Sequence, residues 1–316
     1  MIELTIDGIT VEAAEGQTIF EAAQAAGIEI PTLCHDPKLK PVGVCRLCAV
    51  DVGERTLTAS CVRKVEGDMK VITQTDEIKS HRRMLVDLLM ADQPEPQSDA
   101  RESALGDNQL LALADEFDAW GAEWKGQDKE TTDHSSPVIS VDHEACILCD
   151  RCIRACNDVQ GNEVISRTGK GYGARIAFDL NNPMGESTCV SCGECAAACP
   201  TGALVDKPID APLRPASQLK QVDSVCPYCG VGCAIRYHVD EKSDRIVFAE
   251  GRESPGNQSR LCVKGRYGWD YARNDQRLTK PLIRRESAYP KSALSADVRG
   301  ETNKRKKPGG LVDYDQ

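Results

Sequence analysis

The sequence predicts an α+β protein made of several small domains. Its 316 residues are enough for two or three domains, and an apolar content of 41% is enough for ordinary hydrophobic cores. Only 4% of the residues are aromatic, and sixteen cysteines divide into four groups of four with none left over. Short strand patterns and an alanine-rich helix pattern accompany these groups. We therefore expect several small units, each organised around its cysteines.

Cysteine spacing defines four quartets, called the first to fourth quartet in chain order. They are Cys34, Cys45, Cys48 and Cys61; Cys146, Cys149, Cys152 and Cys156; Cys189, Cys192, Cys195 and Cys199; and Cys226, Cys229, Cys233 and Cys262. The N-terminal stretch MIELTIDGITVEAAEG has no export signal, and no apolar run approaches the roughly 20 residues that span a bilayer. We therefore expect a cytoplasmic chain without membrane insertion. Thiols stay reduced in the cytoplasm, so metal ligation explains the quartets better than disulfides do.

The second and third quartets share one pattern. CILCDRCIRAC and CVSCGECAAAC align without a gap at an offset of 43 residues, and both read C-x2-C-x2-C-x3-C. Zinc commonly takes two separated C-x2-C pairs, whereas three thiolates on one tight loop are typical of bacterial two-cluster ferredoxins, whose runs exchange their last ligands. We predict a double [4Fe-4S] domain over 137–212. One cluster should bind Cys146, Cys149, Cys152 and Cys199, and the other Cys189, Cys192, Cys195 and Cys156.

The first quartet has the different spacing C-x10-C-x2-C-x12-C, which favours a [2Fe-2S] cluster although plant-type ferredoxins have four residues in place of the ten. Its surroundings predict a β-grasp ferredoxin domain over 1–78. IELTI and TVEAA are short strands joined at Asp7-Gly8, a hairpin signal. TIFEAAQAAG is a helix that opens with Thr18 and Glu21 as a capping box and stops at Gly27, and TLTASC is a strand that carries the last ligand. His35 is interpreted as a neighbour of the cluster.

Residues 79–136 predict a helical linker. IKSHRRMLVDLLM predicts an amphipathic helix whose apolar face is Ile78, Leu85, Leu88 and Leu89. His81 is interpreted as a residue of this helix. After a stretch rich in proline and acidic residues, LLALADEFDAWGAEW predicts a second helix. Its apolar residues are Leu111, Leu113, Phe117 and Trp120, and they can form core or a docking surface.

The fourth quartet reads C-x2-C-x3-C-x28-C, in CPYCGVGC and LCVKGRYGWDY. Gly230, Gly232 and Gly265 would let the backbone approach a bulky cluster there. With the preceding units, this motif resembles the N-terminal half of the large subunit of cytoplasmic NAD-dependent formate dehydrogenases, which are molybdopterin oxidoreductases. The resemblance runs from Met1 to about Arg285. It implies a small [4Fe-4S] domain of the molybdopterin oxidoreductase type over 219–275, with Lys264 as an electron relay between cluster and pterin.

The resemblance also implies what lies outside this chain. Formate would be oxidised, reversibly, at molybdenum or tungsten held by two pterin guanine dinucleotides, and electrons would pass to a partner subunit with FMN and NAD. Residues 276–316 resemble the lead into that catalytic domain, so we expect either a larger parent subunit or a separate catalytic chain, and no catalytic residue here. GKGYGAR at 169–175 lacks the order of a nucleotide fingerprint and predicts a turn. Whether the [2Fe-2S] cluster lies on the main electron path stays open, as does a higher oligomer.

Other functions make different predictions. Relatives carry a further cluster on one histidine and three cysteines after the β-grasp domain, but no cysteine lies between Cys61 and Cys146. The large subunit of an NADH:quinone oxidoreductase should keep that cluster, and the diaphorase subunit of a hydrogenase should lack the fourth quartet. A stand-alone polyferredoxin-like protein should contain no pterin. A net charge of -10 argues against nucleic acid as a partner, and we interpret NKRKK at 303–307 as a solvated loop.

Overall fold

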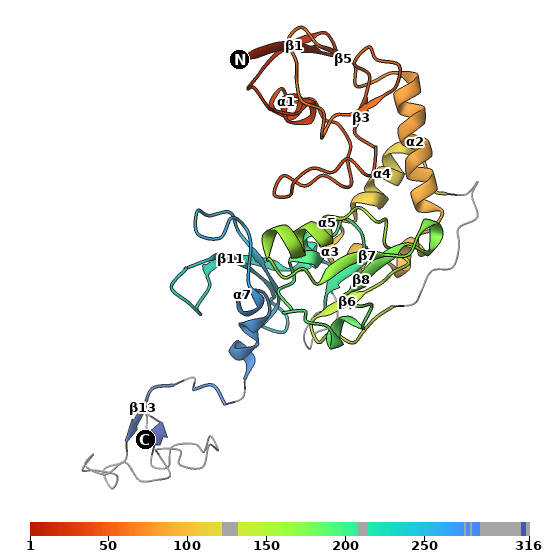
Figure 1. Ribbon diagram of the computed structural model, residues 1–316. Coiled ribbons are helices and arrows are strands. Elements are labelled where there is room, and N and C mark those ends of the chain that lie inside the picture. The colour runs from red at the N-terminus through yellow and green to blue at the C-terminus, as the bar shows by residue number, and fades with distance from the viewer. Residues whose placement is uncertain (122–131, 208–213, 275, 279, 285–310, 314–316) are drawn as a thin grey trace. The chain divides into compact units, whose positions relative to one another are not determined.

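A computed structural model of the chain describes residues 1–121, 132–207, 214–274, 276–278, 280–284 and 311–313 (Figure 1). The chain divides into two compact units, Met1–Trp269 and Asp270–Gln316. Helices and short strands alternate along the first unit, so the predicted α+β class is confirmed.

The N-terminal domain begins with the predicted hairpin. Strand β1 (Ile2–Ile6) pairs antiparallel with β2 (Ile9–Ala13), and it pairs in parallel with β5 (Lys70–Val71) on its other edge. Asp7 and Gly8 have φ angles of 49° and 81°, as the two central residues of a type I′ turn require. Both bonds of the capping box at Thr18 and Glu21 are present at the start of α1 (Ile19–Ala25). The predicted strand TLTASC is shorter than expected: β4 (Thr58–Ala59) pairs with β3 (Ala49–Val50), and Cys61 follows in a turn.

The helical linker packs as core against the first cysteine loop. It comprises α2 (Asp76–Met90), the 3-10 turn η1 (Pro96–Ser98), α3 (Ala100–Leu105) and α4 (Gln109–Phe117). Helices α2 and α4 lie side by side (Figure 1), and their buried residues join Leu33 and Leu47 in one hydrophobic cluster. The buried face of α2 overlaps with the expected one, since Ile78 is buried and Leu85 and Leu89 pack against the core. Leu88 is exposed instead, and Arg82, Val86 and Met90 are also buried. In α4 the buried positions are Leu110 and Ala114, and Trp120 beyond it is exposed.

The double ferredoxin domain is built from two small sheets and two short helices. Strand β6 (Ile139–Val141) pairs with β9 (Leu204–Asp206), and β7 (Ile165–Thr168) pairs with β8 (Arg175–Phe178). The predicted turn in 169–175 is a 3-10 turn, η3 (Gly171–Gly173), between β7 and β8. Helix α5 (Arg151–Arg154) continues into a π-helical turn, η2 (Ala155–Val159). A further 3-10 turn, η4 (Met184–Glu186), precedes the third quartet, and α6 (Glu194–Ala198) lies within it.

The last domain of the first unit is an antiparallel sheet followed by a helix. After the turn η5 (Ala216–Gln218), β10 (Lys220–Val225), β11 (Ala234–Asp240) and β12 (Arg245–Gly251) pair in that order. Helix α7 (Val263–Tyr267) follows Cys262 directly and leads into η6 (Gly268–Arg273). In the second unit, β13 (Leu282–Arg284) pairs antiparallel with β14 (Leu311–Asp313). The rest of the expected lead over 276–316, the run at 303–307 included, lies largely outside the described residues.

None of the helices within the described ranges combines the length and the apolar character needed to cross a bilayer.

Candidate iron–sulfur sites

All sixteen cysteines lie in the described part of the chain, and none is paired in a disulfide. The structure gathers them into four separate sets of four within the first unit. The positions of the thiols and the space between them decide whether each set fits an iron–sulfur cluster.

The sulfurs of the first quartet face one another between the sheet and α2. Side-chain hydrogen bonds with Cys45 and Cys61 lower the pKa of the Cys34 thiol to about 2, and the bond with Cys61 lowers that of Cys48 to about 6. The same bonds raise the pKa values of the Cys45 and Cys61 thiols. Backbone N–H groups of Leu33 and Cys34 also point at the Cys45 sulfur, both at 3.5 Å. Four mutually facing thiols that receive amide hydrogen bonds fit a cluster.

The second and third quartets exchange their last members in space. One cavity is lined by Cys146, Cys149, Cys152 and Cys199, and another by Cys189, Cys192, Cys195 and Cys156. Each cavity is small, with a volume of about 10 Å³, so the four thiols of each set surround one narrow shared space.

The thiols around these two cavities are held in apolar surroundings. Burial, followed by the charge of Cys199, raises the pKa of Cys149 to about 12. Burial also raises the pKa of Cys152 and of Cys195 well above the ordinary thiol value. Because only the thiolate is a good ligand, binding of a metal cluster must release protons from these groups.

The alignment of the two runs extends to their backbone conformation. Leu148 and Asp150 have φ angles of 54° and 62°, and the aligned Ser191 and Gly193 have 55° and 78°. Left-handed residues between right-handed ones turn consecutive N–H groups toward one side, which creates an anion-binding concavity. The Ser191 N–H lies 3.4 Å from the Cys189 sulfur. Both loops are therefore shaped to stabilise negatively charged thiolates.

The fourth quartet is the most exposed of the four sets. Cys229 and Cys262 are exposed, and only Cys226 is buried. Burial raises the pKa of Cys233, with further contributions from the neighbouring Cys226, Cys229 and Cys262. Of the three glycines expected to admit a cluster, Gly265 lies against the quartet, since a Cβ there would be 3.7 Å from the Cys226 sulfur. Gly232 has a φ angle of 65°, while Gly230 has open space around it.

Lys264 lies in the first turn of α7, two residues after Cys262, and is exposed. His35 packs against Phe20 with ring centroids 4.5 Å apart, and burial lowers its pKa. Among the described residues, no three His, Cys, Asp or Glu side chains stand close enough to hold a single metal ion. A cluster requires a different arrangement, because each thiolate binds a different iron atom in a [4Fe-4S] cluster, and two thiolates bind each of the two iron atoms in a [2Fe-2S] cluster.

Buried arginines connect the cysteine loops, and the sequence patterns did not identify them. Arg154 donates from one nitrogen to the backbone oxygens of Cys34 and Cys149, at 2.6 and 3.3 Å. Arg82 donates to the oxygens of Leu47 and Ala49, on either side of Cys48, at 3.0 and 3.2 Å. No local signal marks these arginines, because the partners in other cysteine loops lie 33 residues or more away, and only Cys149 and Asp150, which Arg154 contacts, are near in sequence.

Arg266 is the corresponding residue between the third and fourth quartets. Its Nε donates to the Cys192 oxygen at 3.0 Å, and its Nη2 donates to Glu194 at 2.7 Å. Burial alone would lower the pKa of Arg266, but the carboxylates of Asp206 and Glu194 outweigh it and hold the pKa above its ordinary value. Arg266 is therefore a fixed positive charge beside the third quartet.

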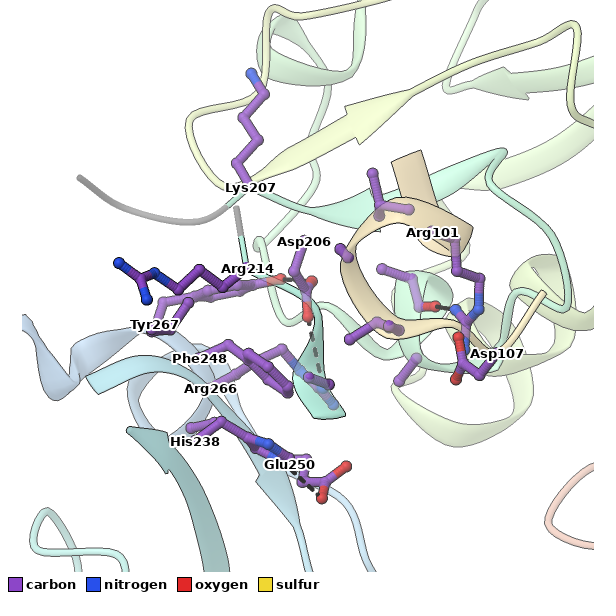
Figure 2. A pocket seen from close by; sticks show the side chains of 18 of the residues that line it. Arg101, Asp107, Asp206, Lys207, Arg214, His238, Phe248, Glu250, Arg266 and Tyr267 are labelled. Atoms are coloured by element: carbon purple, nitrogen blue, oxygen red, sulfur yellow. Dashed lines mark hydrogen bonds and ion pairs between the residues drawn. The ribbon is translucent and has the colours of Figure 1, made fainter. Parts of the chain in front are cut away.

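A cavity of about 410 Å³ lies next to Arg266 (Figure 2). It is lined by the Arg101–Asp107 ion pair at 2.8 Å and by His238, which is 3.0 Å from Glu250 and stacks on Phe248. Other lining residues flank positions 208–213, which lie outside the described residues, so no ligand is assigned to this cavity.

Three protein families match segments of the chain. The family described as 2Fe-2S iron-sulfur cluster binding domain matches residues 1–76, and the 4Fe-4S dicluster domain matches residues 145–203. The Molybdopterin oxidoreductase Fe4S4 domain matches residues 219–274. Segments with [2Fe-2S]-type and [4Fe-4S]-type domains therefore follow one another in this chain.

Several whole proteins are also similar. The NADPH-Fe(3+) oxidoreductase subunit alpha of Geobacter sulfurreducens is 33% identical over 298 residues, which are 93% of this chain and 34% of that protein. A subunit of NADH-quinone oxidoreductase from Rhizobium meliloti is 33% identical over 90% of this chain and 33% of its own length. A Staphylococcus haemolyticus protein named "Putative formate dehydrogenase SH0748" is 27% identical over 90% of this chain and 32% of its own length. The chain thus spans about a third of the length of these curated relatives.

Among solved structures, a chain of the NAD+-reducing [NiFe]-hydrogenase in the H2-reduced state matches with a TM-score of 0.61 and 30% identity. The match covers 67% of this chain and 90% of that one. Fold, cysteine sets and relatives define the class as iron–sulfur subunits of oxidoreductases. Within that class, residues 219–274 of this chain form a domain of the molybdopterin oxidoreductase Fe4S4 type.

Proposed function

We propose that this chain is the electron-transfer part of a cytoplasmic formate dehydrogenase and that it carries one [2Fe-2S] and three [4Fe-4S] clusters. The first quartet would hold the [2Fe-2S] cluster, and the other three would hold [4Fe-4S] clusters, with Cys156 and Cys199 exchanged between the second and third. When bound, such clusters accept and donate single electrons at potentials set by charge, hydrogen bonds and exposure. The observation that carries the proposal is the separation of sixteen cysteines into four sets inside one compact unit.

The cysteine sets differ in how far they are exposed, which favours different surroundings for each in the complete protein. The second and third sets are enclosed, which protects them from solvent, whereas the fourth is surrounded by exposed apolar side chains. Val225, Tyr228 and Val231 are 60%, 44% and 58% exposed beside the exposed Cys229. Such a patch favours coverage by further protein. In the proposal that protein holds the molybdenum or tungsten pterin cofactor, and Lys264 lies between it and the fourth cluster.

Electrons would leave through a partner subunit that binds FMN and NAD. The segment 169–175 forms a turn between two strands and precedes no helix that could bind a dinucleotide phosphate. In the proposal, this chain therefore conducts electrons from the pterin cofactor to the flavin and NAD of the partner subunit.

A second candidate function is that of an electron-transfer subunit of a hydrogenase diaphorase or a stand-alone polyferredoxin-like protein. The hydrogenase chain favours it, because the match includes 90% of that chain at 30% identity. The fourth quartet favours formate dehydrogenase, because its segment matches the Molybdopterin oxidoreductase Fe4S4 domain.

Metal analysis of the native complex, purified without oxygen, tests the proposal. One [2Fe-2S] and three [4Fe-4S] clusters require about 14 iron atoms per chain. Molybdenum or tungsten should be present, and formate should produce the electron paramagnetic resonance (EPR) signals of reduced clusters. Nickel in the complex, together with reduction of the clusters by hydrogen, would favour the hydrogenase candidate. Iron without molybdenum, tungsten or nickel would favour the polyferredoxin. Zinc in place of iron would refute all three candidates.

Variants test the assignment of the quartets. Cys262→Ser should remove about four iron atoms and the fastest formate-dependent reduction, and Cys48→Ser about two, with the other EPR signals retained. Lys264→Met should keep all the iron and slow reduction by formate. Arg260→Met is the matched control for Lys264, since Arg260 precedes Cys262 by two residues and its side chain contacts the Lys38 backbone oxygen at 2.9 Å.

A further inference from the structure

Arg154 joins the first quartet to the second. It is 6% exposed at the end of α5, and its guanidinium crosses to the first cysteine loop, where it donates to Cys34 and to the Lys40 oxygen at 2.5 Å. The nitrogen that reaches the Cys34 oxygen also reaches the Cys149 oxygen. A single atom therefore hydrogen-bonds the backbones of two cysteines that belong to different sets.

Arg266 joins the third quartet to the fourth in a similar way. Its side-chain Nε donates to the Cys192 oxygen, and its backbone N–H donates to the Cys262 oxygen at 3.0 Å. The acid Glu194 binds the same guanidinium and also accepts from the Leu261 N–H at 3.2 Å. Gly193 allows this approach, because a Cβ there would lie 2.3 Å from the Arg266 Cδ.

Between these two junctions the second and third quartets are already joined by exchange. The cavity of the second quartet includes Cys199, and that of the third includes Cys156. The contacts thus run from the first quartet to the fourth without a gap.

We infer that Arg154 and Arg266 are positioning residues that couple neighbouring iron–sulfur clusters, Arg154 between the first and second quartets and Arg266 between the third and fourth. This inference rests on the proposed function, because it needs the cysteine sets to hold clusters. Each arginine fixes the separation of two ligand loops and supplies a short hydrogen-bonded connection between them. One electron passes at each junction: the donor side loses it and the acceptor side gains it, and no covalent bond changes. A reduced viologen can supply the electron in a test.

Lysine substitution is the appropriate perturbation. Lysine keeps the positive charge, but it presents one compact ammonium in place of the planar guanidinium with five donors. Arg154→Lys should therefore lose the shared bonds to Cys34 and Cys149 while it preserves the local charge. Arg151→Lys is the matched control, because Arg151 lies on the same helix, is equally buried and bonds the backbone oxygen of His35 in the same loop.

The experiment uses the full chain, purified anaerobically with its clusters. A pulse of less than one equivalent of methyl viologen radical reduces it, and freeze-quench EPR follows how the electron redistributes. Reduction by viologen depends on protein concentration, whereas redistribution between clusters is first order and does not. Arg154→Lys should slow the first-order phase that brings the [2Fe-2S] signal to equilibrium, and Arg266→Lys should slow the phase that involves the fourth quartet. Arg151→Lys and Arg236→Lys, which replaces an arginine paired with Asp223, should change neither phase.

The final distribution of electrons among the clusters distinguishes a weaker coupling between clusters from a change in their reduction potentials. A slower phase that reaches the native distribution supports the inference, while a slower phase explained by an altered distribution overturns it. Native rates in both variants, with iron retained, also overturn it. If a variant loses iron, the native chain decides: reduction of the [4Fe-4S] clusters should broaden the [2Fe-2S] signal, and an unchanged line overturns the inference. A native chain without iron would refute the proposed function itself.

Discussion

Removal of Arg82 should destabilise the first cysteine loop far more than removal of the adjacent Arg83. Arg82 is 4% exposed on α2 and donates to Leu47 and Ala49, whose peptide groups enclose Cys48. Arg83 is exposed on the same helix. The matched variants are Arg82→Leu and Arg83→Leu, which change charge and shape equally at neighbouring positions.

The expected difference follows from two hydrogen bonds. A bond from a charged donor contributes about 1.5–3 kcal/mol, and its loss leaves a buried carbonyl unsatisfied. Burial lowers the pKa of Arg82, so removal of the charge also recovers some desolvation energy. We therefore expect Arg82→Leu to cost about 2–4 kcal/mol, and Arg83→Leu at most about 0.5 kcal/mol.

Urea unfolding under anaerobic conditions measures this difference through the visible circular dichroism of the iron-loaded chain. With a urea dependence of about 1–3 kcal/mol per molar, the midpoint for the first domain should fall by about 0.7–4 M in Arg82→Leu. Hydrogen exchange at residues 47–50 should rise in the same variant. Equal midpoints for the two variants would refute the role assigned to Arg82.

Three further predictions concern other parts of the first unit. Gly193→Ala should reduce the iron bound by the third quartet because of its clash with Arg266, whereas Gly27→Ala, at a similar φ angle but with nothing within 4 Å, should retain all the iron; equal iron contents would contradict this. Thr18→Ala should cost about 1 kcal/mol in the same unfolding assay, and more than Thr75→Ala, because the Thr18 hydroxyl accepts from the Glu21 N–H and also donates to the Glu21 carboxylate, whereas the Thr75 hydroxyl accepts from the Ile78 N–H. The hydrogen bond with His238 lowers the pKa of Glu250, which also lies near Arg236 and Arg266. The stabilisation that ionised Glu250 contributes to the fold should be complete above the ordinary carboxyl pKa and lost as the pH falls through the lowered pKa. The protection factors of amides in β11 and β12, which are corrected for the intrinsic slowing of exchange by acid, should therefore fall on acidification in the native chain and less so in Glu250→Gln; identical profiles would contradict this.

Local patterns predicted the fold class and much of the N-terminal domain. The Asp7-Gly8 turn and the Thr18 capping box depend on residues within four positions of one another, so the sequence contains their whole signal. The assignment of the sixteen cysteines to clusters stays a prediction, although the structure groups them as their spacing suggests.

Longer-range packing could not be predicted in the same way. On α2 the expected Leu88 is exposed and Arg82 is buried, because backbone oxygens of the first cysteine loop face that side of the helix. A charged residue at a core-facing position lowers the apolar signal, and its partners lie more than 30 residues away. Arg154 and Arg266 were missed for the same reason, since the Cys34 and Cys192 oxygens that they contact lie 120 and 74 residues away.

The interleaved cavities of the second and third quartets constrain how the protein is made. The first of these cavities lacks a wall until Cys199 has left the ribosome, although its other three cysteines are synthesised some fifty residues earlier. A nascent chain that ends between the second and third quartets therefore contains only incomplete cavities when it meets the machinery that delivers iron and sulfide. For the proposed clusters, insertion at both cavities would follow closure of the whole domain, which would make loading of the pair a late event in maturation.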